Sequence, residues 1–317
     1  MGAVDGYGNV GVLARSAGPR YAPETSKEPW MRRPGQLFLF AGLALAVACG
    51  DSGGPDTGPL PDDATHAIGL TIRDEVEASV DALAVPTQLA PYGVQVDQLC
   101  AEPSDPADTD GDGVPTSAEY IITAPPCRFE DIRNTTLDMI GRLQIDDPDP
   151  GAGGAGFDYN GTLVNLRSSF RGKDADHSYS ITRNGTRVLT GTPAGLELAT
   201  DLQLLRTFPG LSDAAVDVQW TVSFAPDTPL QINHPVPAGA LAVAGTMDWL
   251  RGTESYALTV STPEPLHFDV TCDAAQRFDA GEVHAAGTFG DLTGYVRVRW
   301  GDCGDEPSID FVEDGGA

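Results

Sequence analysis

Basic residues are scarce in this sequence of 317 residues. Lysine and arginine together number 19, against 46 aspartate and glutamate residues, which gives a formal net charge of −27. A surface with that charge repels nucleic acid and anionic lipid headgroups, so we expect no nucleic-acid partner and no membrane attachment through basic patches. The same charge favours solubility and attracts divalent cations loosely.

The motifs of the common enzyme classes are absent as well. The sequence has no Gly-x-Ser-x-Gly, His-Glu-x-x-His, Walker loop or Cys-x-x-Cys. Its five histidines are dispersed, and the groups Asp174, Asp176 and His177, and Glu282 and His284, are more typical of solvated loops and faces than of sites. With this many carboxylates, a pair at glycosidase spacing arises by chance and is no evidence. The sequence favours a protein without enzymatic activity, and an envelope hydrolase that uses carboxylates is the alternative.

A long apolar run is lacking too. The run LFLFAGLALAVA, residues 37–48, follows Arg32 and Arg33 and falls short of the roughly 20 residues that a transmembrane helix needs. A basic start, an apolar run and a small residue before the cleavage point predict a signal peptide over residues 31–48. Residues 1–30 show no sustained period, so we interpret them as a gene start set too early or as a disordered cytoplasmic extension.

The junction Leu45-Ala46-Val47-Ala48-Cys49-Gly50 resembles a bacterial lipobox. The resemblance implies that Cys49 becomes the lipidated first residue of the mature protein, and a triacylated terminus anchors stably. Gly50 is compatible with passage to the outer membrane. We therefore expect a lipoprotein of the cell envelope, on the periplasmic or the surface face of the outer membrane. Cleavage elsewhere, with Cys49 incidental, is the alternative.

The mature chain begins with a flexible tether over residues 49–64, rich in glycine, proline and aspartate. A single β-rich domain is then predicted over residues 65–317. Its first element is a helix over residues 67–84, because four apolar residues recur at helical spacing: Ile72, Val76, Val80 and Leu83. The acidic residues Asp74, Glu75 and Glu77 are expected to face away from this stripe. We expect the helix to cap or plug the domain, although it would also suit a partner.

From Tyr120 on, the pattern is typical of strands. Apolar and polar residues alternate over long stretches, which include residues 137–146, 216–224, 241–249 and 295–300. The pair Asn184-Gly185 predicts a two-residue hairpin turn. The fold class is therefore mainly β: a long antiparallel meander that forms a curved sheet, a barrel or a sandwich, with one N-terminal helix.

Residues 108–119 (DTDGDGVPTSAE) have the ligand spacing of a calcium loop. Oxygen ligands are expected at loop positions 1, 3, 5, 7, 9 and 12: Asp108, Asp110, Asp112, the Val114 carbonyl, Thr116 and a bidentate Glu119. Gly113 permits the sharp turn at position 6. The loop resembles the EF-hand-like loops of exported bacterial proteins, including dockerin and thrombospondin type 3 modules. Calcium is thus the expected cofactor, and an unliganded acidic turn is the alternative.

The five cysteines divide into one for lipidation and four for the folded part. Cys100 and Cys127 flank the calcium loop, and Cys272 and Cys303 end two strands near the C-terminus. Disulfides Cys100–Cys127 and Cys272–Cys303 would leave no odd thiol in an oxidising compartment. Five buried thiols in a cytosolic protein are the alternative.

Taken together, lipobox, tether, calcium loop and hairpins resemble an uncharacterised class of bacterial surface lipoproteins. The resemblance implies a location and no activity. We expect a calcium-stabilised envelope protein with a binding or structural role and an unidentified protein or small-molecule partner. The alternatives are a carrier of an apolar ligand in the curved sheet, with the helix as its lid, and the hydrolase named above.

Overall fold

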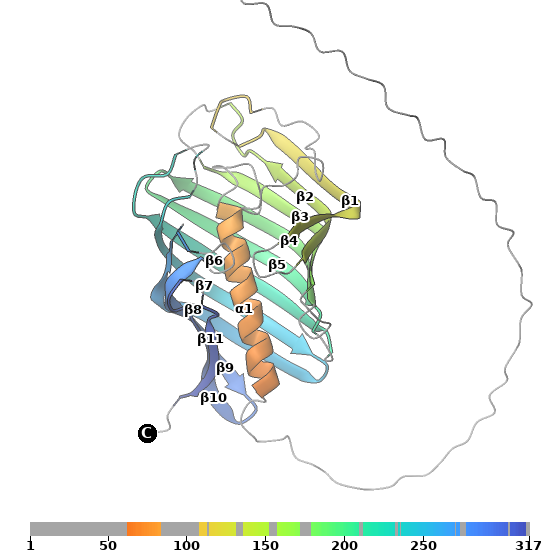
Figure 1. The fold of residues 1–317 in the computed structure, drawn as a ribbon, viewed down its shortest axis with the longest axis vertical. Helices are drawn as coiled ribbons and strands as arrows, with labels where there is room; N and C mark the ends of the chain where they lie inside the picture. The colour runs from red at the N-terminus through yellow and green to blue at the C-terminus, as the bar shows by residue number, and fades with distance from the viewer. Residues whose placement is uncertain are drawn as a thin grey trace, which may run out of the picture. The chain divides into compact units, whose positions relative to one another are not determined.

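The computed structural model describes residues 62–83, 108–112, 114–130, 136–151, 157–171, 179–208, 212–231, 234, 236–269, 271–272, 277–303 and 305–314. In these residues one helix is followed by eleven strands (Figure 1). The elements are α1 (Asp62–Leu83), β1 (Ser117–Glu130), β2 (Thr136–Asp146), β3 (Tyr159–Arg171), β4 (Tyr179–Thr192), β5 (Gly195–Arg206), β6 (Ala214–Pro226), β7 (Gly239–Arg251), β8 (Glu254–Phe268), β9 (Phe278–Phe289), β10 (Leu292–Arg299) and β11 (Ser308–Glu313).

The eleven strands form one antiparallel sheet in which each strand pairs with its neighbour in sequence, from β1 to β11. The prediction of a mainly β antiparallel meander with one N-terminal helix is therefore confirmed. The sheet is open, with β1 and β11 at its two ends in the described chain, so it is neither a closed barrel nor a sandwich of two sheets.

One face of the sheet is apolar and buried, and we call it the inner face. Strand β5 shows the alternation most clearly, because every second residue from Leu196 to Arg206 is buried while the residues between them are exposed. Strands β6 and β7 repeat this pattern, and the buried side chains of the strands and the helix form one hydrophobic cluster. The opposite, outer face carries the polar residues.

Helix α1 lies along the inner face of the sheet (Figure 1). Ile72, Val76, Val80 and Leu83 are all buried, as the helical spacing predicted. The helix begins at Asp62 and ends at Leu83, so its first residues come from the segment interpreted as tether. No helix in the described part of the chain has the length and apolar character that crossing a membrane requires.

The acidic residues of α1 do not face away from the core, contrary to the prediction. Glu75 is 1% exposed and receives hydrogen bonds from Arg183 of β4. The physical reason is that the inner face carries arginines as well as apolar residues. A second side of the helix can therefore be buried without leaving its carboxylates unpaired.

The predicted turn at Asn184-Gly185 is also wrong, because β4 runs straight through both residues. Asn184 pairs with Gln203 of β5, and its side-chain oxygen accepts a hydrogen bond from the Asn165 N–H at an irregularity of β3. Gly185 has φ +135, and a Cβ there would lie 2.2 Å from the Asp201 carbonyl oxygen. The glycine serves a close approach of two strands, and the chain turns later, at Pro193 and Ala194.

Candidate functional site

Three carboxylates of the predicted calcium loop lie together. One oxygen from each of Asp108, Asp110 and Asp112 is within 4.8 Å of the other two. Calcium binds oxygens at 2.3–2.6 Å, so two ligands on opposite sides of one ion are about 4.8 Å apart. The first three side-chain positions predicted from the sequence therefore converge on a volume that suits one ion.

Hydrogen bonds within the loop set this curvature. The backbone N–H groups of Gly111, Asp112 and Val114 donate to the carboxylates of Asp108, Asp110 and Asp112 at 2.7, 3.4 and 2.8 Å. Gly111 has φ +81, a conformation that glycine adopts at low cost. Gly113, the predicted turn residue, lies outside the described residues.

The loop is anchored to the domain by Val114, whose side chain is completely buried in the hydrophobic cluster. Next to it, the Thr116 hydroxyl lies 3.0 Å from the Thr109 hydroxyl, and the Thr116 carbonyl accepts a hydrogen bond from the Asp147 N–H. A change at the loop is therefore coupled directly to core packing.

Glu119, the predicted bidentate ligand, belongs to strand β1 and does not join the three aspartates. Loop positions 10–12 are already strand, so their side chains alternate: Ala118 and Tyr120 are buried, and Glu119 is partly exposed. The Glu119 carboxylate lies 3.0 Å from the Arg142 guanidinium of β2. The twelve-residue pattern assumes a helix after the loop, and the strand changes the direction of its last ligand.

A buried carboxylate beside the loop was not identified by the sequence pattern, and, like Glu119, it is not part of the cluster of three aspartates. Asp147, in the turn between β2 and β3, is 8% exposed, and its Oδ2 has no hydrogen-bond partner among the described residues. Burial raises the pKa of the Asp112 carboxyl, and three neighbouring carboxylates raise it further: Asp110, Asp147 and Asp108. Only the pairing of β1 with β2 brings Asp147 to the loop, which is why a linear spacing did not identify it.

The carboxylates of Asp108, Asp110 and Asp112 form a donor set that fits calcium. Carboxylate oxygens are the ligands that hard cations prefer, and the charge of several carboxylates at one place calls for a cation. No ion pair to a basic side chain is found for Asp110, Asp112 or Asp147 in the part of the chain that the structure describes. A bound ion would supply the compensating charge.

A second cluster of carboxylates lies between α1 and the sheet, and here arginines compensate the charge. We call it the helix–sheet arginine network. Four acidic residues of the helix each lie within 3.0 Å of an arginine that belongs to or precedes a strand. The pairs are Asp63 with Arg251, Asp74 with Arg206, Glu75 with Arg183 and Asp81 with Arg277.

Arginines and a tyrosine of the sheet also bind the helix backbone. Arg206 donates to the Leu70 carbonyl at 3.2 Å, Arg187 to the Ala78 carbonyl at 3.3 Å, and the Tyr159 hydroxyl to the Ala82 carbonyl at 2.9 Å. The Ala82 carbonyl is in the last turn of α1, where no helical N–H is available to it. The network therefore fixes the position of the helix along the sheet.

The electrostatics of the network differ from one carboxylate to the next. Burial tends to raise the pKa of Asp74, but the charges of Arg73 and Arg206 outweigh it and hold this pKa well below its usual range. At Asp81 the effect of burial exceeds the attraction of Arg277, so the Asp81 pKa is raised. Asp74 is thus held firmly as an anion, and Asp81 less so.

A signal for this network is present in the sequence. Arg183 and Arg187 follow the same alternation as Ile181 and Leu189, and Arg206 continues the alternation of the β5 leucines. An arginine in phase with the buried face of a strand implies a buried acidic partner. Lysine occurs only at Lys27 and Lys173, which accords with the planar guanidinium being the better group for buried pairs.

A row of buried polar side chains crosses the inner face in register. Arg187 of β4 pairs with Thr200 of β5, and Thr200 pairs with Trp220 of β6. All three are at most 6% exposed. Arg187 Nε, Thr200 Oγ1 and Trp220 Nε1 have no hydrogen-bond partner among the described residues. Buried groups of this kind normally bind water or a ligand.

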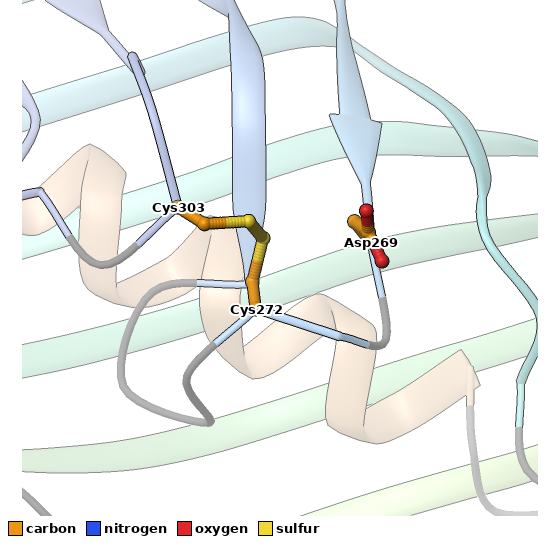
Figure 2. A group of neighbouring side chains, drawn as sticks. All are labelled: Asp269, Cys272 and Cys303. Atoms are coloured by element: carbon orange, nitrogen blue, oxygen red, sulfur yellow. A yellow bond between two sulfur atoms is a disulfide. The ribbon is translucent and has the colours of Figure 1, made fainter.

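The predicted disulfide Cys272–Cys303 is present (Figure 2). The two Cα atoms are 5.0 Å apart, and the bond joins the segment after β8 to the segment after β10. The loop that it closes contains two strands, β9 and β10, which pair as one hairpin. Asp269 lies nearby, but its carboxylate accepts hydrogen bonds from Thr271, and the two sulfurs are bonded to each other, so these residues offer no thiolate for a metal.

Two histidine–carboxylate pairs lie at the sheet surface. His284 is 2.9 Å from Glu282 and stacks on Tyr295, so the two residues grouped in the sequence are in contact. His267 is 2.7 Å from Asp279, whose hydrogen bond raises the His267 pKa. All of these side chains are partly exposed, and the described residues show no hydroxyl or thiol nucleophile hydrogen-bonded to either imidazole.

Several predictions fall outside the described residues: the signal segment, Cys49 as the predicted lipidation site, Cys100, and the group Asp174, Asp176 and His177. Cys127 lies in β1 opposite Met139, but its side chain is not among those described. Comparison of the chain with protein-family models, with curated proteins and with solved structures gives no match.

Proposed function

We propose that this protein is a lipid-anchored component of the cell envelope whose β-sheet domain is stabilised by calcium and has a binding or structural role. The observation that carries the proposal is the convergence of Asp108, Asp110 and Asp112 beside the buried Val114. An ion held by these carboxylates is linked through Val114 to the core. Calcium therefore acts as a brace at the start of β1.

The way α1 fills the inner face favours a structural role for the domain. Apolar residues of the helix belong to the same buried cluster as the inner face, and the helix–sheet arginine network ties both ends of the helix to the strands. The surface that remains for partners is the outer face and the edge strands β1 and β11.

Calorimetric titration of the purified protein with calcium tests the proposal, together with thermal unfolding in calcium and in chelator. We expect saturable uptake of one ion and a higher Tm in calcium. At a concentration 100 times Kd the gain in unfolding free energy is about 2.7 kcal/mol. Magnesium is the control and should bind more weakly than calcium, because it requires a tight octahedral shell of ligands. Absence of calcium uptake, with equal Tm in both buffers, would reject the brace.

The lipid anchor has a separate test. Replacing Cys49 by serine in a bacterial host removes the thiol that carries the acyl chains, so the protein should move from the membrane fraction to the soluble fraction. Replacing Cys272 by serine is the matched control, because that residue is in a disulfide and should leave fractionation unchanged. Membrane association that survives the Cys49→Ser change would contradict lipidation at this residue.

A carrier function is the second candidate, favoured by the row of Arg187, Thr200 and Trp220. A ligand with an apolar chain and one acceptor group would match an apolar face that contains these unpartnered donors. Palmitate is a suitable probe, with tryptophan fluorescence as the readout. A carrier should bind it saturably and more weakly after Thr200→Val, whereas the exposed Thr259→Val should bind as the wild type does. Fluorescence that does not change with palmitate would count against a carrier.

A further inference from the structure

The outer face of the sheet exposes apolar side chains as well as polar ones. In the described part of the chain no helix covers this face, because α1 lies on the inner face (Figure 1). The large apolar side chains that are exposed in the described residues all belong to β1–β7, and each is 38–51% exposed: Ile121, Ile140, Val164, Val188, Leu205 and Leu250. Exposed apolar side chains that gather on one face indicate an interaction surface.

The charged residues of the outer face are segregated. Arg142 of β2 and Arg167 of β3 are exposed there. In β4 to β8 every arginine is buried on the inner face, so no arginine or lysine of these strands faces outward. The same strands expose carboxylates instead, which include those of Asp201, Asp217 and Asp248. Between β1 and β8, the outward-facing arginines of the described chain are therefore confined to β2 and β3.

One cross-strand row shows this segregation most clearly. Strand pairing places the following outward-facing residues side by side across β1 to β7: Ile121, Arg142, Val164 with Asn165 at a bulge, Asn184, Gln203, Asp217 and Asp248. Asp217 and Asp248 are directly opposite each other on β6 and β7, and two like charges in that position destabilise a sheet. The cation of this row, Arg142, is four strands away from Asp217 and does not compensate the aspartates.

We propose that the outer faces of two copies of this chain pack against each other around a two-fold axis that runs parallel to the strands over β4. Such an axis exchanges β2 with β6, because these strands lie at equal distances from β4 in the sheet. Arg142 of each copy then meets Asp217 of the other, so the same contact forms twice, as in an isologous interface. Arg142 is half exposed and pairs with Glu119 through Nε, and a guanidinium has five N–H donors, so it can bind a second carboxylate.

The neighbouring row adds apolar contacts to this charge pair. It contains Ile140 of β2, Arg167 of β3, Leu205 of β5 and Ala215 of β6, all aligned by strand pairing. The same axis exchanges β3 with β5, so it places Ile140 over Ala215 and the apolar stem of Arg167 over Leu205 of the second copy. Seven strands about 4.8 Å apart are about 29 Å wide, which suits a standard interface of about 800 Å² per partner.

Sedimentation equilibrium of the purified full chain over a range of concentrations tests the proposal. The wild type should show a monomer–dimer equilibrium. Arg142→Asp and Asp217→Arg each bring like charges together at the interface, and each should raise the dimer Kd by about tenfold or more. The double variant with both substitutions exchanges the two charges, so its Kd should return to within about threefold of the wild type.

Arg299→Asp is the matched control. It makes the same charge change at an exposed arginine of β10, outside the proposed contact, so its Kd should stay near that of the wild type. Asp217→Arg separates the contact from the overall charge, because it changes the formal net charge by two, from −27 to −25. Lower overall repulsion would strengthen an association that has no specific charge contact, whereas the proposed interface is weakened.

A wild type that stays monomeric at every concentration overturns the proposal. A dimer that neither single variant weakens also overturns it, because its interface then lies elsewhere, for example at the edge strands. Weakening in both single variants without recovery in the double variant would show that Arg142 and Asp217 do not meet, and an equal loss in Arg299→Asp would reduce the effect to net charge. The substituted residues are exposed, so Tm should stay near the wild-type value, and thermal unfolding checks that every variant is folded.

Discussion

The protein contains two groups of carboxylates that differ in whether a basic side chain compensates their charge. In the helix–sheet arginine network, each acidic residue of the pairs lies within 3.0 Å of an arginine, and Glu75 and Asp74 are buried without penalty from an uncompensated charge. Asp112 of the predicted calcium loop and Asp147 of the turn after β2 are buried, and the described residues provide no basic partner for either. The first group has its counter-charge in the chain, and for the second the described residues supply none.

The difference explains how so acidic a chain can fold around a charged helix. Four arginines of the strands are buried on the inner face beside the helix, where an unpaired helix carboxylate would be costly: Arg183, Arg187, Arg206 and Arg251. Three changes to the carboxylates and their partners test this contrast, in decreasing order of expected effect.

The largest effect is expected from Arg183→Met. The change leaves the Glu75 carboxylate buried without its closest partner, and loss of one member of a buried pair costs about 3–5 kcal/mol. Urea unfolding measures the loss. Arg142→Met is the control, because its pair with Glu119 is half exposed and is worth less than about 1 kcal/mol. Equal losses in the two variants would show that burial does not distinguish the network.

A smaller effect with a pH signature is expected from Asp74→Asn. The pKa of Asp74 is lowered in the folded state, so the carboxylate stabilises the protein above its unfolded pKa and loses this contribution as the pH falls below about 4. We expect a loss of about 2 kcal/mol at pH 7, typical of hydrogen bonds to a charged group, and a smaller difference from the wild type at pH 3. A difference that is the same at both pH values would contradict the assignment.

The smallest effect, and of opposite sign, is expected from Asp112→Asn in chelator. The asparagine oxygen still accepts from the Val114 N–H, while repulsion among the loop carboxylates decreases, so stability should rise by roughly 0.5 kcal/mol. In calcium the same variant should be less stable than the wild type, because a ligand is lost. Thermal unfolding in both buffers checks the reversal. A variant that is destabilised in chelator would show that the loop does not depend on an external cation.

Local patterns predicted the elements and part of the site. The alternation along β5–β7, the helical spacing of Ile72 to Leu83, the disulfide Cys272–Cys303 and the convergence of three loop aspartates all follow from sequence distance alone. The Asn184-Gly185 turn failed because strand pairing outweighed a local turn preference. The prediction for the acidic side of α1 was wrong because the helical period shows which residues are apolar. It does not show which side chains of the sheet the acidic residues will contact, such as Arg183 at Glu75.

The sequence by itself determined a mainly β chain with one helix, an acidic surface and a loop of aspartates, because these depend on periodicity and on neighbours within about twelve residues. Only the tertiary structure decided which carboxylates are compensated. Pairing of β1 with β2 brings Asp147 to the loop and turns Glu119 toward Arg142, and the seating of α1 brings Glu75 to Arg183, 108 residues away. Charges separated by that distance in sequence meet only when the sheet has formed, so no local pattern can record their partners.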